Sequence, residues 1–157
     1  MRLALFQPDI AQNTGTLLRL GACLDLPIDI IEPCGFLWTD KGIKRAGMDY
    51  LEMADFRRHA SWDEFLAYRK DHPDEYGRIV LLTTHASMPY TEFKFQKNDI
   101  ILMGRESAGV PEIVHQTADA RLLIPMNKKA RSINVALSAV MVVGEALRQT
   151  DLFVKNF

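Results

Sequence analysis

The sequence has only two cysteines among its 157 residues. Cys23 and Cys34 form no CxxC pair and have no histidine at ligand spacing, which excludes a disulfide-stapled scaffold and indicates free, reduced thiols. The histidines show no HExxH spacing, so we expect no metal and assign surface or capping roles to His59, His72, His85 and His115.

Long apolar runs are also absent. The apolar start Leu3 to Phe6 is interrupted by Gln7-Pro8-Asp9 before it reaches the length of a signal peptide. No run approaches the roughly 20 apolar residues that cross a bilayer. With 48% hydrophobic residues the chain is long enough for one core. We therefore expect a single domain over residues 1–157, soluble and cytoplasmic, without contact to a membrane.

A strong net charge is missing as well. Nineteen Lys and Arg balance twenty Asp and Glu to a formal charge of −1, so a polyanion would have to be attracted by local patches. Cations do gather beside expected turns, where they are either solvated faces of a mixed surface or contacts to an anionic partner. The three clusters are Lys41, Lys44 and Arg45; Arg57 and Arg58; and Lys128, Lys129 and Arg131.

Three common catalytic or nucleotide-binding motifs are not found. No GxGxxG follows the first expected strand, no GxxxxGK[ST] occurs, and no GxSxG surrounds a serine. These absences argue against a dinucleotide fold, a P-loop and a serine hydrolase.

What the chain does contain is a regular alternation of strand and helix patterns. Apolar runs predict strands over residues 2–6, 28–32, 52–56, 78–84, 99–104 and 120–126. Helices are predicted over 13–26 with Asn13 as N-cap, over 61–73 with Ser61 and Glu64 as a capping box, over 110–118 with Pro111 in the first turn, and over 133–149. This alternation indicates an α/β fold with a mostly parallel sheet flanked by helices.

Ligands of such sheets bind beyond the carboxyl ends of the strands. Three late strands end in polar or glycine-rich segments, "LLTT", "LMGRESAG" and "IPMNKKARS". We expect these three segments to form the walls of one crevice. Ser132 and Asn134 also stand where the last helix begins, so they are candidate N-caps.

Three segments together resemble the signature motifs of a known family. "NTGTLLRLG", "LMGRESAGVPE" and "IPMNKKARSINVALSAV" resemble, in order and spacing, the motifs of the SPOUT RNA methyltransferases. "IIEPCGFLWTDKGIKRAGMDY" resembles the TrmL (YibK-like) group of that superfamily, which comprises short tRNA 2′-O-methyltransferases. The likeness covers nearly the whole chain.

The resemblance implies more than the residue patterns do. It implies a carboxyl-terminal trefoil knot, a homodimer across the active site, and S-adenosylmethionine as cofactor, with S-adenosylhomocysteine as product. The implied reaction methylates the ribose 2′-hydroxyl of the wobble nucleotide, cytidine or uridine 34, in the anticodon stem-loop of tRNA.

Site residues follow from the resemblance position by position. Arg19 is the implied catalytic residue, and we expect it to orient the ribose electrostatically because a guanidinium group stays protonated. The implied cofactor-binding residues are Leu82, Thr83, Gly104, Glu106, Ile124, Met126, Ser132 and Asn134. The RNA-binding candidates are Lys41, Lys44, Arg45 and Arg131. One departure is Gly144, where many relatives carry Tyr.

Other functions stay open at this point. The chain is alternatively a SPOUT methyltransferase for another tRNA or rRNA nucleotide, or a SPOUT protein that binds RNA without catalysis. A small-molecule α/β enzyme is a further class. The intact "GRESAG" and "ARSIN" segments disfavour a non-catalytic protein, and the basic clusters with no glycine fingerprint disfavour a small-molecule enzyme.

Overall fold

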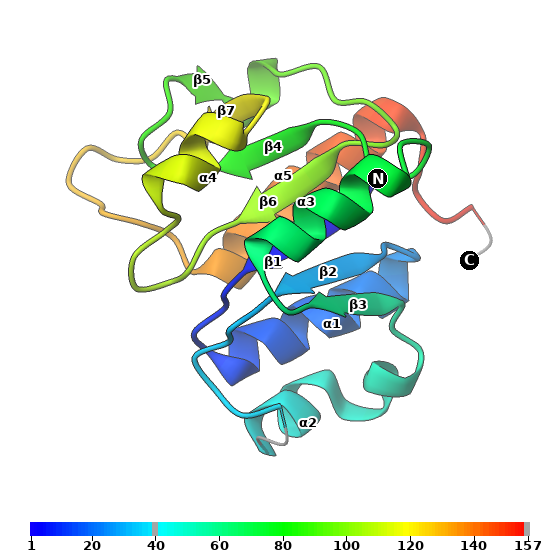
Figure 1. Ribbon diagram of the computed structural model, residues 1–157. Coiled ribbons are helices and arrows are strands. Elements are labelled where there is room, and N and C mark those ends of the chain that lie inside the picture. The colour runs from blue at the N-terminus through cyan, green and yellow to red at the C-terminus, as the bar shows by residue number, and fades with distance from the viewer. Residues whose placement is uncertain (39–40, 156–157) are drawn as a thin grey trace.

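Seven parallel strands form one twisted sheet in the order β3-β2-β1-β6-β4-β7-β5 (Figure 1). The computed structural model describes residues 1–38 and 41–155, apart from the side chains of residues 44 and 48. The strands are β1 (Arg2–Phe6), β2 (Ile28–Ile31), β3 (Phe56–His59), β4 (Ile79–Leu82), β5 (Met88–Pro89), β6 (Ile100–Met103) and β7 (Ala120–Leu123). The predicted parallel α/β sheet is confirmed.

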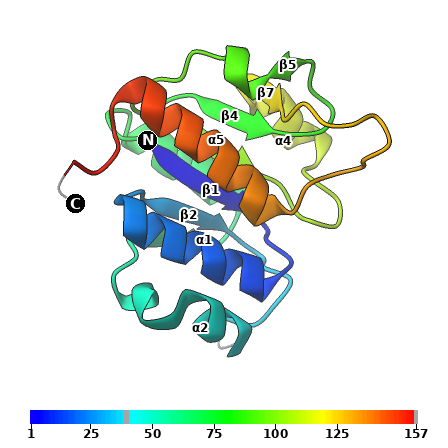
Figure 2. The ribbon, with the colours of Figure 1, turned by 180° about the vertical axis from the view of Figure 1, so that it is seen from behind.

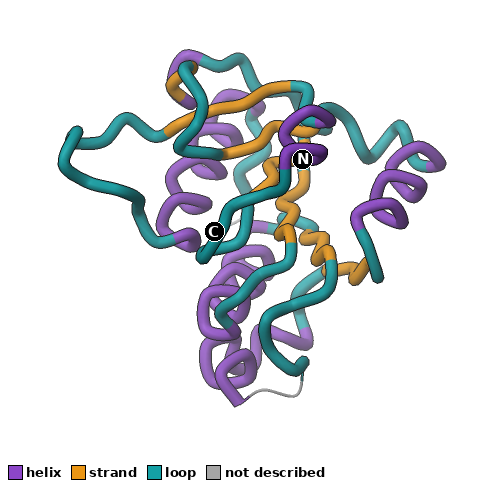
Figure 3. Tube along the Cα trace, turned by 60° about the vertical axis from the view of Figure 1, so that its left-hand side comes forward, coloured by secondary structure: helices purple, strands orange, loops and turns teal. Residues whose placement is uncertain are grey.

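Helices cover both faces of the sheet (Figures 1 and 3). One face carries α3 (Trp62–Asp71) and α4 (Glu112–Thr117); the other carries α1 (Ala11–Leu24) and α5 (Val135–Thr150), which pack against each other (Figure 2). The short α2 (Lys41–Gly47) packs on α1, and two 3-10 turns span Met48–Glu52 and Tyr90–Glu92. None of the described helices has the length and apolar character of a bilayer-spanning segment.

Strands β1, β2, β4 and β6 each contribute to two apolar cores, because neighbouring side chains on a strand point to opposite faces. Leu3 and Leu5 of β1 belong to the cluster under α1 and α5, whereas Ala4 and Phe6 belong to the cluster under α3 and α4. All five residues of β1 are buried. Burial on both faces explains why these strands read as continuous apolar runs in the sequence.

Two predicted helix starts are confirmed by their side-chain hydrogen bonds. The Glu64 amide donates to the Ser61 hydroxyl at 3.1 Å, and the Glu64 carboxylate accepts from the Ala60 amide at 2.9 Å. Asn134 caps α5, since its side-chain oxygen accepts from the amides of Ala136 and Leu137 at 2.9 and 3.3 Å. Ser132 lies outside that cap.

Asn13 as the N-cap of the first helix is wrong. The helix begins at Ala11 after Ile10, which provides no side-chain cap, and Asn13 stands inside the first turn. Pro111 is likewise the N-cap of α4 and not a first-turn residue. For Asn13 the shift reflects tertiary hydrogen bonds to Glu106 and Asn134 that outweigh the local capping signal.

The segment between β2 and β3 also differs from the prediction. The glycine- and lysine-rich connection contains α2, and the predicted strand over 52–56 is replaced by β3 at Phe56–His59. The polar sequence "FRRH" concealed this strand because β3 lies at the sheet edge and leaves Arg57 and Arg58 exposed. Arg58 pairs with Glu32 at 2.6 Å, which gives one arginine of that cluster a protein partner.

His59 is a buried polar residue, contrary to the predicted surface or capping role. Its Nε2 lies 2.8 Å from the carboxylate of the fully buried Asp29. The same carboxylate accepts bonds at 2.8 Å from the Arg2 Nε and from the Tyr76 hydroxyl. His72, by comparison, is the C-cap residue of α3, as a capping role predicts.

The charge of Asp29 is maintained by these partners. Burial by itself raises the pKa of Asp29, but the hydrogen bonds from His59, Arg2 and Tyr76 outweigh it and lower the pKa below its ordinary value. Burial and the nearby Asp29 charge raise the pKa of Tyr76. Asp29 is therefore ionised at neutral pH and neutralises Arg2, whose side chain is almost as deeply buried.

The two thiols are free, as predicted. Cys23 is exposed, whereas Cys34 is partly buried. Burial, followed by the nearby Glu32 charge, raises the pKa of Cys34 to about 11. Cys34 is therefore a protonated thiol at neutral pH and a poor nucleophile.

We predict that Asp29→Asn lowers the free energy of unfolding by about 3–5 kcal/mol at pH 7, because it leaves the buried Arg2 without its counter-charge. The folded-state pKa of Asp29 is depressed, so its contribution is present above the unfolded value near pH 4 and is lost as the pH falls through the folded value. Urea unfolding from pH 7 to pH 3 should show the difference between the two proteins shrinking with acid.

The matched control is Asp71→Asn, which changes an exposed carboxylate at the end of α3. It should alter the free energy of unfolding by less than about 0.5 kcal/mol. A loss of under about 1 kcal/mol for Asp29→Asn would mean that Arg2 is neutralised elsewhere, for instance by Glu75 at 3.8 Å.

Candidate active site

A cavity of about 580 Å³ opens at the carboxyl ends of β4, β6 and β7. Its walls include residues 81–85 at the end of β4, residues 103–110 at the end of β6, and Ile124, Met126 and residues 132–135 after β7, together with Ile10 and Asn13 at the start of α1. The last of these loops extends well away from the sheet (Figure 1). The crevice therefore lies where a parallel sheet places its ligands, and its volume is that of a small-molecule site.

All of the residues that the sequence implied for cofactor binding line this cavity. Apolar walls come from three of them, and hydroxyl, amide, carboxylate and backbone groups come from the others. The set is Leu82, Thr83, Gly104, Glu106, Ile124, Met126, Ser132 and Asn134. Segments separated by up to 52 positions thus meet at one site, since each follows a neighbouring strand of the sheet.

A chain of three polar side chains connects the walls. The Asn13 amide nitrogen donates to the Glu106 carboxylate at 3.0 Å, and the Asn13 amide oxygen accepts from the Asn134 amide nitrogen at 3.1 Å. The side-chain oxygen of Asn134 caps α5. The three sequence motifs are therefore joined directly, and this use of Asn13 explains why it is not the cap of its own helix.

The loop after β6 is fixed at a second point. The Glu106 carboxylate also accepts from the Asp9 amide at 3.0 Å. The Asp9 carboxylate accepts from the amide and the hydroxyl of Ser107 at 3.0 and 2.6 Å. Both carboxylates at this end of the site are thus bonded to protein donors, and Glu106 has a positioning role in addition to its place in the cavity wall.

Two glycines let this loop close tightly. Arg105 and Gly109 exchange backbone hydrogen bonds of 3.0 and 2.9 Å, and Gly109 has a positive φ of 62°, which favours glycine. A Cβ on Gly104 would approach the Gly109 backbone carbonyl carbon at 2.9 Å. The packing of the protein itself therefore gives a steric reason for glycine at position 104. This reason is independent of the predicted contact between Gly104 and the cofactor.

Arg19 is not brought to the cavity of its own chain. It is exposed on α1, with its guanidinium carbon 4.8 Å from the centre of the Tyr50 ring. The residues of α1 that line the cavity are at its beginning, and Arg19 is six positions beyond Asn13, or about 9 Å along the helix axis. Within one chain, the predicted catalytic residue and the predicted cofactor residues are separate.

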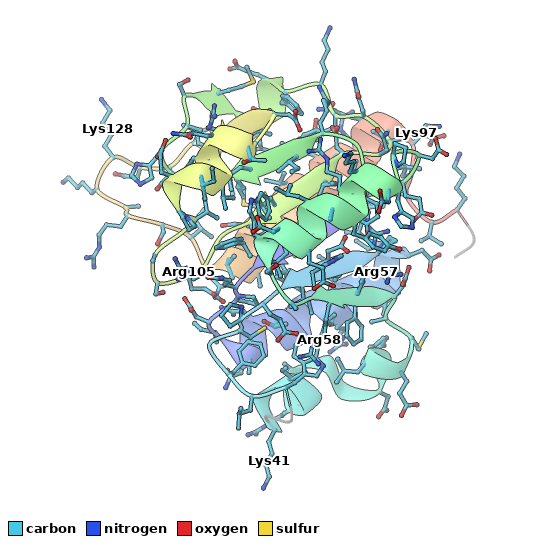
Figure 4. All side chains as sticks on the ribbon, viewed as in Figure 1. Lys41, Arg57, Arg58, Lys97, Arg105 and Lys128 are labelled. Atoms are coloured by element: carbon cyan, nitrogen blue, oxygen red, sulfur yellow. The ribbon has the colours of Figure 1, made fainter. Side chains whose placement is uncertain are left out.

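The predicted RNA-binding cations occupy two regions. Lys41 and Arg45 are exposed on α2, and Lys44 belongs to the same helix. Arg131 is exposed on the loop after β7. Figure 4 shows Lys41 at the foot of the molecule and Lys128 at the tip of the loop, so the two basic regions lie well apart in this view.

Some lining residues were missed by sequence reasoning. His85 and His115 both border the cavity, with ring centres 6.3 Å apart, although only surface or capping roles were predicted for them. No group of three potential metal ligands occurs in the part of the chain that the structure describes. Arg105 of the "GRESAG" segment also lines the cavity. Its position next to Glu106 in the sequence was the feature that would have predicted this.

The comparisons with known proteins agree with this geometry. Residues 1–144 match a family model described as the SpoU rRNA Methylase family. The chain is 54% identical over 156 residues to a protein of Ancylobacter novellus named tRNA (cytidine(34)-2′-O)-methyltransferase, covering 99% of this chain and 97% of the relative. A protein of Beijerinckia indica with the same name is 56% identical over 153 residues, with coverages of 98% and 94%.

A solved structure described as "Structural insights into the 2-OH methylation of C/U34 on tRNA" superposes with a TM-score of 0.86 at 36% identity, and the match covers 94% of each chain. The resemblance that the three motifs suggested is confirmed by these matches. The chain belongs to the SpoU rRNA methylase family.

Proposed function

We propose that this protein transfers a methyl group from S-adenosylmethionine to the ribose 2′-hydroxyl of nucleotide 34, a cytidine or uridine, in tRNA. The observation that carries the proposal is the single cavity built by the three motif segments at the carboxyl edge of the sheet. Relatives that match over nearly their whole length carry the corresponding enzyme name, which supports the choice of tRNA and of position 34.

The residues of the cavity fit the proposed cofactor. Leu82, Ile124 and Met126 offer apolar surface for a purine ring, and Thr83 and Ser132 offer hydroxyl groups for a ribose and an amino-acid end. When bound, S-adenosylmethionine supplies an electrophilic methyl group on a sulfonium, so no metal is needed. The role of the protein residues is then to hold the acceptor hydroxyl in line with that group.

Arg19 is proposed to orient the ribose and its adjoining phosphate. Its guanidinium group is exposed and carries a permanent positive charge, which suits an electrostatic role better than that of a base. Because Arg19 lies away from the cavity of its own chain, we propose that it acts in the site of a second copy. The RNA-binding cations Lys41, Lys44, Arg45 and Arg131 would hold the anticodon stem-loop nearby.

The surface of α5 supports the proposed homodimer. Leu137, Val140 and Met141 are 61%, 43% and 41% exposed on this helix, and together with Gly144 they follow the spacing of one helical face. A Cβ on Gly144 would meet no atom within 4 Å, so this face is open along its length. Small and apolar residues on one face suit close contact with the same face of another copy.

We further propose that residues 1–157 form one domain whose carboxyl-terminal third is threaded as a trefoil knot, and that the enzyme works in the cytoplasm, where it meets tRNA. The order of the strands supports the threading, because β7 lies between β4 and β5 while α5 returns to the far side of the sheet beside α1. Threaded connections are rare among proteins.

We predict that calorimetry will detect binding of S-adenosylhomocysteine to the wild-type protein. Met126→Ala should weaken this binding about tenfold, because it removes apolar surface from the cavity wall. Met88→Ala, an equal truncation of a 45% exposed side chain outside the cavity, serves as the control and should leave affinity unchanged. Absence of binding by the wild-type protein would reject the proposed cofactor.

We predict that Arg19→Ala reduces the rate of methyl transfer to a tRNA transcript by roughly tenfold to more than a hundredfold, the effect of losing about 1.5–3 kcal/mol of charge-assisted bonding. Cofactor affinity should stay within about threefold, because Arg19 does not line the cavity of its own chain. Gln12→Ala, an exposed change on the same helix, is the control. Transfer at the wild-type rate, or loss of cofactor binding, would contradict this role.

We predict that the protein sediments as a dimer at micromolar concentration and that Leu137→Asp shifts it toward the monomer, because the change places a charge in the proposed contact. Ile113→Asp on α4 is a matched control, since Ile113 is also 61% exposed. It should not alter the sedimentation coefficient. A monomeric wild-type protein, or equal behaviour of the two variants, would remove α5 from the interface.

A further inference from the structure

Arg105 stands out among the charged residues of the candidate site. It follows β6 at the carboxyl edge of the sheet, lines the cavity, and begins the loop that the two backbone bonds with Gly109 close. Figure 4 places it at the same edge of the molecule as Lys128. The backbone of Arg105 is thus held rigidly at the mouth of the site.

Among the residues that the structure describes, none accepts a hydrogen bond from the side chain of Arg105. Its Nε atom is buried and has no hydrogen-bond partner within residues 1–38 and 41–155, and no carboxylate in those ranges forms an ion pair with its guanidinium. Its side chain lies against the Phe6 ring, whose centre is 5.9 Å from the guanidinium carbon. A buried donor without an acceptor is costly, so an acceptor from outside the protein would stabilise this arrangement.

The acidic neighbours of Arg105 are already bonded. Glu106 accepts from Asn13 and from the Asp9 amide, and Asp9 accepts from Ser107. Both carboxylates are thus engaged by other donors at the site. The arrangement leaves a positive group beside the cavity and is complementary to an anion that carries several acceptor oxygens.

The position of Arg105 helps to choose between two anionic groups, the carboxylate of the cofactor and a phosphate of the RNA. Phe6, which Arg105 covers, belongs to the apolar cluster under α3 and α4. Ile124 and Met126, the proposed walls for the purine ring, belong with the cluster under α1 and α5. Within the shared cavity, the guanidinium therefore contacts a residue of a different cluster from the one that includes the proposed cofactor walls.

We propose that Arg105 binds a backbone phosphate of the substrate RNA at the mouth of the cavity, next to the nucleotide that is methylated. This inference rests on the proposed function. Guanidinium groups bind phosphate through two parallel N–H bonds, which would supply acceptors for a side chain that has none within the protein. Arg105 would then fix the register of the strand, while the cofactor occupies the cavity behind it.

The test compares Arg105→Gln and Arg105→Lys with Lys97→Gln, which removes an exposed positive charge at the opposite edge of the molecule (Figure 4). Three quantities are measured for each: calorimetric affinity for S-adenosylhomocysteine, affinity for a tRNA transcript over a range of potassium chloride concentrations, and kcat and KM for tRNA. Circular dichroism and thermal unfolding verify that each variant is folded.

We expect Arg105→Gln to weaken tRNA binding about tenfold and to reduce the slope of log affinity against log salt by roughly 0.7–0.9, the value for one lost phosphate contact. KM for tRNA should rise by a similar factor, with kcat and cofactor affinity within about twofold. Arg105→Lys should retain the salt slope but recover only part of the affinity, because an ammonium group binds phosphate through a single point. Lys97→Gln should match the wild type.

Two results would overturn this assignment. Loss of S-adenosylhomocysteine affinity with unchanged tRNA binding would assign Arg105 to the carboxylate of the cofactor. Unchanged values of all three quantities would show that Arg105 contacts no ligand. A wild-type protein that binds cofactor but no tRNA would instead contradict the proposed function, and the phosphate role of Arg105 with it.

Discussion

Asn13 is hydrogen-bonded to Glu106 on one side and to Asn134 on the other, and the arrangement of the whole candidate site depends on this short chain. The three residues follow different strands and would otherwise belong to independent loops. A carboxylate that accepts an amide hydrogen bond contributes about 1.5–3 kcal/mol, more than a neutral pair. Because Asn134 also caps α5, the same bonds that close the cavity fix the start of the last helix.

The sheet makes this arrangement possible. All of its strands run in the same direction, so the loops after β4, β6 and β7 emerge at one edge although long segments separate them in the sequence. The cores under both faces hold the strands, and the loops add only a few apolar residues to them, such as Ile124 and Val110. Other loop positions carry polar residues. Glu106 and Asn134 bond to Asn13 at the cavity, whereas Lys128 and Arg131 are exposed.

The sequence predicted correctly those features that depend on interactions between residues close together in the chain. Apolar runs such as residues 2–6 and the capping box at Ser61 depend on neighbouring residues, and the structure confirms both. Asn13 was assigned to a cap because its use by Glu106, 93 positions away, leaves no local trace. The strand at Phe56–His59 was misplaced for a related reason, since its pairing with β2 through the backbone does not depend on its exposed arginine side chains.

The separation of Arg19 from the cavity is a consequence of helix geometry that no motif reveals. The motif places Asn13 and Arg19 six positions apart. In a helix, two residues at this separation lie on different faces and about 9 Å apart along the helix axis. The first residue is held within the site by two hydrogen bonds, while the second lies exposed above Tyr50. If Arg19 acts on the ribose, one chain can build a cofactor site but not a complete active site. Under the proposed function, assembly of two copies is then a condition for chemistry and not for cofactor binding.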